Sequence, residues 1–511
     1  MAFEDTYIAF LQKLPGITEP VRRLNFKDKL KWTGIILLLY FVMGQVSIYG
    51  VDPQSFEQFQ FLAILLGSEF GSLVTLGIGP IVTAAIILQL LVGSKVIPWD
   101  MQTEKGKALF QGTQKLLAIV LSFVEAVVYV GMGAIPPSVP GLFWIVVIQI
   151  TIGAILLIFM DEIVSKWGFG SGIGLFIVAN VSKVMMIRMF NPLSASGILP
   201  SVGNPPSGAI PFAFTAIAFG EPLQAFLALL PVFATFLVFV LVVYAQAIRV
   251  EIPLAFGSVR GFGRRWPLKY FYTSNIPVIL TAALLANLNL MARTLYTNGV
   301  DWLGVFDENG NVLGGLVYFL TPPRIDSLAG YMIFAGLFAL LGVLIARHFK
   351  KGNFKFALVG TIAGLFTWFF FASSLGLSSL IVVTGMDVVR MFTYTMFMAI
   401  GAIIFGLFWV TTSGMDAGSV ANQIQSTGMQ IPGYRRDIRI IERVLKKYIT
   451  PLTILGAASV GLLAAYADFT GALGTGTGIL LATTIIYQLY EQIAQQHMED
   501  MHPALRRLIG R

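Results

Sequence analysis

Residues 73–92 read LVTLGIGPIVTAAIILQLLV, an apolar run of membrane-spanning length that is interrupted by Gly77, Gly79 and Pro80. Proline removes a backbone donor and clashes with the preceding turn. Broken backbone at membrane depth persists only where it is buried in protein or lines a cavity. The apolar residues 56–66 that precede this run are too few to span a bilayer. The region predicts either a half-inserted helix and a kinked span beside a cavity, or a surface helix and an ordinary proline-kinked span.

The composition around this stretch indicates that most of the chain lies in lipid. Of 511 residues, 56% are hydrophobic and 12% charged, whereas a soluble domain carries about 25% charged residues. A span needs about 20 mostly apolar residues. The candidates are residues 32–49, 73–92, 116–132, 142–160, 173–189, 226–247, 272–291, 329–346, 356–371, 389–411, 449–467 and 479–493.

Lysine and arginine gather in alternate connections between these spans, which predicts their orientation. Cytoplasmic loops carry the excess of positive charge, so we expect both chain ends in the cytoplasm. Two of the basic connections, residues 247–270 and 414–448, are longer than a turn requires. A basic loop is usually only a topology signal, but this length suits docking on an acidic or RNA-rich partner.

Few residues suit catalysis, metal binding or ion coupling. The chain has no cysteine, and its three histidines have no ligand spacing. Glu125 lies inside a predicted span, and Asp161 and Glu162 lie at the inner end of another. The first thirty residues are amphipathic, which predicts a helix either on the membrane surface or packed on the protein's own loops.

Several segments together resemble the SecY family. They include TLGIGPIVTAAIILQLLVG, DEIVSKWGFGSGIGLFI, YTSNIPVILTAALLAN and GALGTGTGILL, in the expected order. The likeness is greatest to archaeal SecY and the eukaryotic alpha subunit of the Sec translocon. It implies an all-α polytopic bundle around an hourglass pore, with two pseudo-symmetric five-span halves at 1–190 and 226–511 and an external loop at 191–225. Residues 329–371 depart from the family pattern and predict an inserted two-span hairpin, making about twelve spans.

The resemblance also implies roles for particular residues. Pore-ring members would be Ile78, Val82, Ile173, Ile177, Ile276, Ile279 and Leu481. A plug at about 54–71 would include Phe56, Phe59, Phe61, Leu62, Ile64 and Leu65. The polar cluster of a lateral gate would be Thr83, Glu125 and Asn287, with Asn275 nearby. Cytosolic docking loops would present Arg260, Arg264, Arg265, Arg435 and Arg436.

The implied function is a protein-conducting channel of the plasma membrane, with both termini cytoplasmic and no cofactor, metal or catalytic residue. Its expected partners are SecE and SecG or Sec-beta type small subunits, the ribosome and nascent chain, signal peptides and the lipid bilayer, with no specific nucleic-acid sequence. A secondary transporter for a small solute is the main alternative and would need a compact polar site at the midplane. An intramembrane hydrolase would need a paired nucleophile and base, or metal ligands, within spans.

Overall fold

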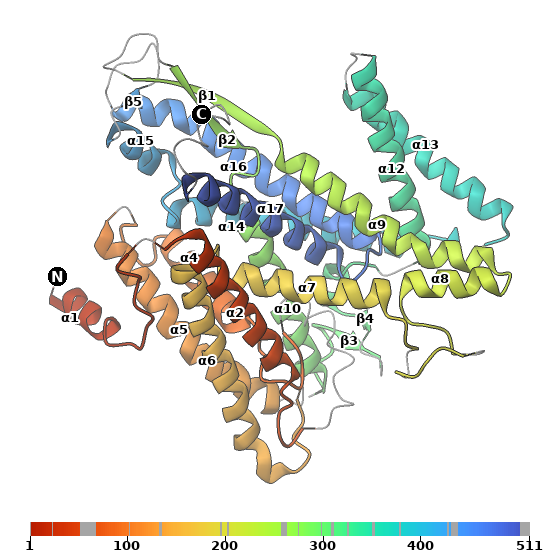
Figure 1. Ribbon diagram of the computed structural model, residues 1–511, viewed down its shortest axis with the longest axis horizontal. Coiled ribbons are helices and arrows are strands. Elements are labelled where there is room, and N and C mark those ends of the chain that lie inside the picture. The colour runs from red at the N-terminus through yellow and green to blue at the C-terminus, as the bar shows by residue number, and fades with distance from the viewer. Residues whose placement is uncertain are drawn as a thin grey trace.

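The computed structural model describes most of the chain, and all statements below concern these residues. They are 2–22, 24–51, 68–101, 103–131, 135–194, 197–201, 204–256, 263–273, 275–297, 299–307, 311–323, 326–349, 353–377, 380–426, 429–430 and 438–500. Figure 1 shows a mostly helical molecule whose long helices cross one another as a bundle.

A helix lies at every predicted span. These helices are α2 (Phe26–Gln45), α4 (Gly79–Gly93), α5 (Glu104–Gly131), α6 (Phe143–Trp167), α7 (Gly172–Phe190), α9 (Pro222–Gln246), α10 (Ile276–Thr297), α12 (Asp326–His348), α13 (Asn353–Ser374), α14 (Gly385–Thr412), α16 (Ile438–Phe469) and α17 (Gly476–Asp500). Within the described residues, nine helices are long and apolar enough to cross a membrane. The prediction of a polytopic membrane helical bundle is confirmed.

Shorter elements lie in the connections. The helices are α1 (Ala2–Leu11), α8 (Ala209–Ala218), α11 (Leu316–Leu320), α15 (Ala417–Ser426) and the 3-10 turn η2 (Pro140–Leu142). The strands are β1 (Arg249–Phe256), β2 (Gly263–Lys269), β3 (Val305–Phe306), β4 (Val312–Gly314) and β5 (Met429–Gln430). The sheet order β2-β1-β5 joins the two long basic connections, because Ala255 of one pairs with Gln430 of the other. The sequence did not predict this pairing.

The interruption at Pro80 begins a helix and does not kink one, which corrects the predicted kinked span at 73–92. Residues before Gly79 form turns, Gly77 has φ +54°, and Pro80 occupies the first turn of α4. Proline is favoured there because its missing N–H has no partner in the first turn of any helix. The 15 residues of α4 rise about 22 Å, less than the roughly 30 Å hydrocarbon core. Helix α4 alone is therefore too short to cross the hydrocarbon core.

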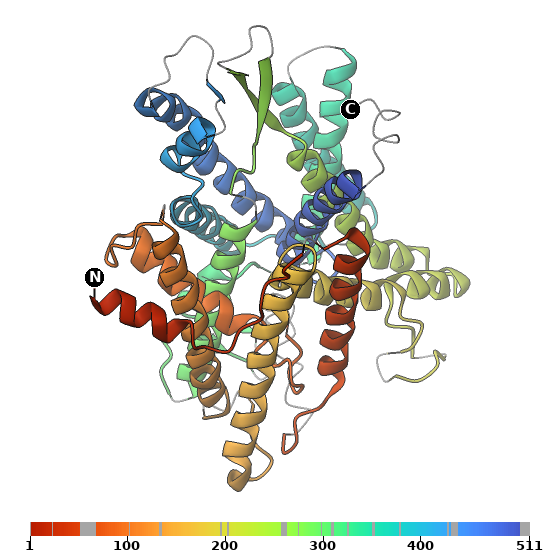
Figure 2. The same cartoon turned by 60° about the vertical axis from the view of Figure 1, so that its left-hand side comes forward.

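Contacts between the early and late helices hold the bundle together. Helix α4 packs on α10 and α14, and α17 packs on both α7 and α9. At the end of the bundle that carries Lys29, Lys107, Lys166 and Lys269, called here the basic end, α1 packs on α5. Tyr7 Oη lies 3.0 Å from Thr113 Oγ1, and Figure 2 shows α1 beside α5. The N-terminal helix thus packs on helix α5, whereas the sequence left open either the membrane surface or the protein's own loops.

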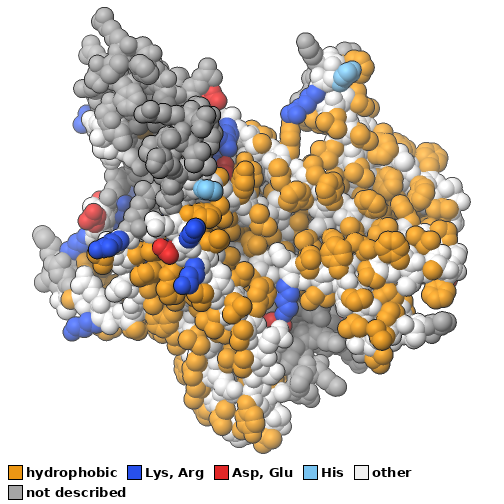
Figure 3. All heavy atoms as spheres, in the orientation of Figure 1, with side chains coloured by type: hydrophobic (Ala, Val, Ile, Leu, Met, Phe, Trp, Pro, Cys, Tyr) orange, Lys and Arg blue, Asp and Glu red, His pale blue; other side chains and the backbone are white. Residues whose placement is uncertain are grey.

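Helices α12 and α13 form a hairpin at the periphery (Figure 1). Helix α13 packs chiefly on α12, and glycines at their seam allow close backbone approach: a Cβ on Gly364 would lie 2.3 Å from Phe334 O. Tyr466 of α16 anchors the hairpin by donating a 2.7 Å hydrogen bond to Met332 O. Figure 3 shows an apolar surface extending over this side of the molecule, whereas charged side chains gather on the opposite side.

Candidate functional site

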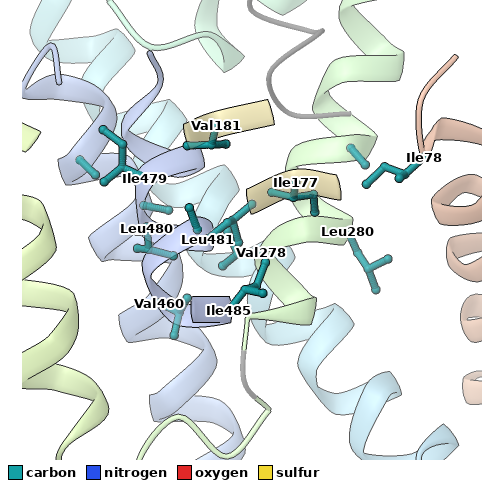
Figure 4. Close-up of a cluster of buried hydrophobic side chains, with 14 of the residues drawn as sticks. Ile78, Ile177, Val181, Val278, Leu280, Val460, Ile479, Leu480, Leu481 and Ile485 are labelled. Atoms are coloured by element: carbon teal, nitrogen blue, oxygen red, sulfur yellow. The ribbon is translucent and has the colours of Figure 1, made fainter. Parts of the chain in front are cut away.

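All seven residues predicted to form a pore ring belong to one hydrophobic cluster. They come from the start of α4, from α7, from α10 and from α17, and so from both halves of the chain. The buried members are Ile78, Val82, Ile177 and Leu481, and the partly buried members are Ile173, Ile276 and Ile279. In the view of Figure 4, Ile177 lies between Leu481 and Ile78. Branched apolar side chains from four helices therefore contribute to one continuous apolar core.

A cavity of about 950 Å³ opens beside this cluster. Its wall includes Val82 and the three partly buried ring residues, together with Lys29 and Lys107 of the basic end. The cavity therefore extends from the apolar cluster toward the basic end of the bundle.

Local sequence explains why α4 can begin beside this cluster. Ile78 precedes the helix with φ −85° and ψ 0°, and its carbonyl accepts the first helical hydrogen bond from Val82 N, 3.0 Å away. The turn before it presses against α6, where a Cβ on Gly153 would lie only 1.8 Å from Leu73 O. A glycine on α6 and Pro80 on α4 together place Ile78 in the cluster.

Three of the four predicted gate residues meet where α4, α5 and α10 adjoin. Asn287 Nδ2 donates to Thr83 Oγ1 at 3.2 Å, and Thr83 Oγ1 donates to Gly79 O at 2.9 Å. Glu125 Oε2 is buried without a hydrogen-bond partner in the described part of the chain. It faces the start of α4, since a Cβ on Gly79 would lie 3.3 Å away. A single polar seam thus joins α4 and α5 to α10.

Asn275, the fourth predicted member, lies elsewhere. Its carbonyl accepts from Val278 N and Ile279 N at 3.1 Å, so it begins α10, and it lines the cavity. Asn287 follows it by twelve positions, which correspond to about 18 Å along the helix. The structure therefore separates Asn275 from the polar seam.

The other membrane-end carboxylates have structural partners. Asp161 Oδ1 accepts from Ile173 N at 2.9 Å and so caps α7. Glu162 pairs with Lys115 at 2.6 Å and with Lys166 at 2.8 Å. These arrangements account for both groups without a role in ion transport.

An ion pair that the sequence did not reveal joins Glu69 to helix α7. Glu69 Oε1 pairs with Lys183 Nζ at 2.7 Å, and Asn180 Nδ2 donates to Ser68 O at 3.3 Å. Both contacts tie residues 68–69 to α7. The partners are more than a hundred residues apart, so no local pattern could predict them.

Several predicted site residues fall outside the described parts. These are the plug residues Phe56, Phe59, Phe61, Leu62, Ile64 and Leu65, and the loop residues Arg260, Arg435 and Arg436. Arg264 and Arg265 are placed on strand β2, opposite Leu254 and Pro253 of β1. Among the described residues no group of three or more histidine, cysteine, aspartate or glutamate side chains could hold a metal ion.

The fold and site define a multi-pass membrane protein with an open cavity beside an apolar core. The SecY family profile matches residues 72–490, and a profile for the plug domain of Sec61p matches residues 38–71. The chain therefore belongs to the SecY family.

Relatives in two archaea match almost the whole chain. The protein translocase subunit SecY of Methanothermobacter thermautotrophicus is 42% identical, over 97% of both chains. That of Methanocaldococcus jannaschii is 41% identical, over 99% of both.

Solved structures match the fold as well as the sequence. One described as a protein conducting channel has a TM-score of 0.76 and 40% identity, covering 97% of this chain and 98% of the other. The channel of a canine ribosome–channel complex from the endoplasmic reticulum has a TM-score of 0.73, 40% identity and the same coverage. The channel architecture is thus shared along nearly the entire chain.

Proposed function

We propose that this chain is the central subunit of a protein-conducting channel. It passes unfolded polypeptide across a membrane and releases hydrophobic segments sideways into lipid. The observation that carries this proposal is that seven branched apolar residues from four helices belong to one core cluster and that four of them line an open cavity. Such side chains form no fixed hydrogen bonds, so they can close around any passing chain, and a narrow apolar constriction excludes water when empty.

The polar seam is the proposed lateral exit. Thr83, Glu125 and Asn287 lie where α4 and α5 adjoin α10, helices that belong to different halves of the chain. Hydrogen bonds between membrane helices contribute about 0.6 kcal/mol on average. A seam held by so few bonds opens when an apolar segment competes for it.

The proposed partners and location rest on the basic charge of two connections and on what similar proteins bind. The two basic connections, joined through β1 and β5, suit an RNA-rich surface, and the canine relative was solved in a ribosome complex. We place this basic end, and with it both termini, in the cytoplasm, following the positive-inside rule. The plasma membrane is the proposed location, and small subunits of the SecE and SecG or Sec-beta type are the proposed membrane partners.

Cross-linking to a stalled nascent chain tests this function. The chain has no cysteine, so a single Ile177→Cys substitution in the cluster reports on that position alone. We expect it to form a disulfide with a cysteine in a ribosome-bound nascent chain that is engaged in the reconstituted protein. Met186→Cys, on the same helix but 52% exposed, is the matched control and should form none.

Two results would count against the proposal. Equal cross-linking at both positions would show that the nascent chain does not pass the apolar cluster. Ion-coupled uptake of a small solute by proteoliposomes, without any nascent-chain adduct, would instead favour the transporter.

A further inference from the structure

Glutamines are concentrated around the open cavity. Seven of the nineteen glutamines in the chain line it: four on α17, two on α5 and one on α4. The charged side chains in the described wall are Lys29 and Lys107, and no carboxylate is among them. We call this glutamine-rich cavity the amide vestibule. Its polarity comes mainly from neutral groups that can each both donate and accept hydrogen bonds.

On two helices, one face carries apolar side chains at the cluster and glutamine side chains farther along the helix. On α17, Leu481 belongs to the cluster, and Ile485, Gln488, Gln492 and Gln495 line the vestibule. These positions are spaced by three or four residues, so they share one helix face. From Leu481 to Gln495 this face rises about 21 Å, which matches roughly six residues of extended polypeptide.

Helix α4 repeats the pattern from the other half of the chain. Val82 belongs to the cluster, while Ala85 and Gln89 follow at spacings of three and four residues and line the vestibule. Gln111 and Gln114, three residues apart on α5, complete an opposing wall. Amide groups from three separate helices therefore face one space.

Three buried polar atoms in the walls of the two cavities have no partner among the described residues. Gln89 is 2% exposed, and its Oε1 has no hydrogen-bond partner within the described structure. An adjoining cavity of about 400 Å³ shares Gln488, Gln492 and Gln495, and there Gln246 Nε2 and Thr273 Oγ1 are likewise buried and unpaired among the described residues. Gln89 Oε1 is an unpaired acceptor and Gln246 Nε2 is an unpaired donor. A peptide group offers one group of each kind.

We propose that the amide vestibule binds the backbone of an unfolded polypeptide in an extended conformation, through hydrogen bonds to its peptide groups. This inference rests on the proposed function and adds the chemical feature of the substrate that is recognised. Each residue of an unfolded chain brings one donor and one acceptor that lose water on entering a confined space. Neutral amides replace that water regardless of sequence, and the modest net free energy of each bond lets the chain slide.

A peptide with and without backbone donors tests the proposal. The probe is a fluorescent peptide with an apolar signal segment and a glycine–serine tail long enough to reach along α17. Its partner peptide carries N-methyl groups in the tail, which remove N–H donors. Affinities are measured by fluorescence anisotropy for the full chain in lipid nanodiscs and for the triple variant Gln488→Leu, Gln492→Leu, Gln495→Leu.

A matched control removes as many amides from the surface. Gln12, Gln45 and Gln224 are exposed and line neither cavity, so Gln12→Leu, Gln45→Leu, Gln224→Leu should bind as the unaltered protein does. We expect the unaltered protein to bind the N-methylated peptide about tenfold more weakly, because several hydrogen bonds of modest net value are lost together. The vestibule variant should bind both peptides equally, at the weaker affinity.

The outcomes separate the two proposals. If the unaltered protein binds both peptides equally while Ile177→Cys still forms nascent-chain adducts, the channel stands and the backbone-binding inference is overturned. An unchanged preference in the vestibule variant overturns it as well. If neither peptide binds and no adduct forms, both proposals fall.

Discussion

Removing the hydrogen bond between Thr83 and Asn287 should make the lateral exit open more easily. The bond is 3.2 Å long and joins α4 to α10. A side-chain hydrogen bond between membrane helices contributes about 0.6 kcal/mol on average and about 1.7 kcal/mol at most. One leucine at the centre of a membrane segment contributes roughly 0.5 kcal/mol. Breaking the bond is therefore equivalent to adding about one to three leucines to the signal segment that competes for the seam.

The assay is the lowest leucine content at which a signal segment still engages the reconstituted channel. Thr83→Val keeps the side-chain shape and Asn287→Leu removes the amide, and each should lower this threshold by about one to three leucines. The double variant should lower it little further, because both changes remove the same bond. Tyr466→Phe removes an interhelical bond of 2.7 Å that joins α16 to α12, neither of which carries a seam residue, and should leave the threshold unchanged. The reasoning is refuted if the seam variants leave the threshold in place or if Tyr466→Phe lowers it equally.

Two further predictions concern stability. Gly153→Ala should lower the thermal unfolding midpoint by several degrees, because its Cβ would lie 1.8 Å from Leu73 O and such overpacking costs about 3 kcal/mol or more. Gly34→Ala, whose Cβ would have nothing within 4 Å, should leave the midpoint unchanged. Equal midpoints for the two variants would contradict the packing argument. Burial, followed by the charge of Asp416, raises the pKa of Tyr272 to about 12. The neutral phenol therefore stabilises the fold fully below pH 10, and this stability is lost as the pH rises from about 10 to about 12. Between pH 10 and pH 12, the free energy of unfolding should fall less steeply with pH for Tyr272→Phe than for the unaltered protein. Parallel curves would show that Tyr272 does not contribute to the pH dependence.

Hydropathy was sufficient to locate the helices but not their ends. The run at 73–92 is apolar throughout, yet α4 begins only at Gly79 because Pro80 favours a first-turn position. Hydropathy averaged over a window reflects the side chains and does not show which backbone groups form hydrogen bonds. The pairing of Ala255 with Gln430 was invisible for a related reason, since it joins segments far apart in the chain.

The apolar and amide parts of the site differed in how far the sequence could reveal them. A pore-ring role for Ile78 and Leu481 was predicted only through a resemblance, because isoleucine and leucine at helical spacing look the same in any membrane core. The glutamines of α17 were missed, although Gln488, Gln492 and Gln495 share one face in the sequence alone. Their meaning depends on Gln89 and Gln111, which only the fold brings opposite them.

The hairpin of α12 and α13 has a consequence for how chain length can change during evolution. Two antiparallel helices return the polypeptide to the side from which it left, so α14, α16 and α17 keep their orientation. A single extra helix would invert all three and move the basic connection before α16 to the opposite face. At the rim, where α13 packs chiefly on its own partner, a pair of helices can be gained or lost without changing the orientation of the helices that follow.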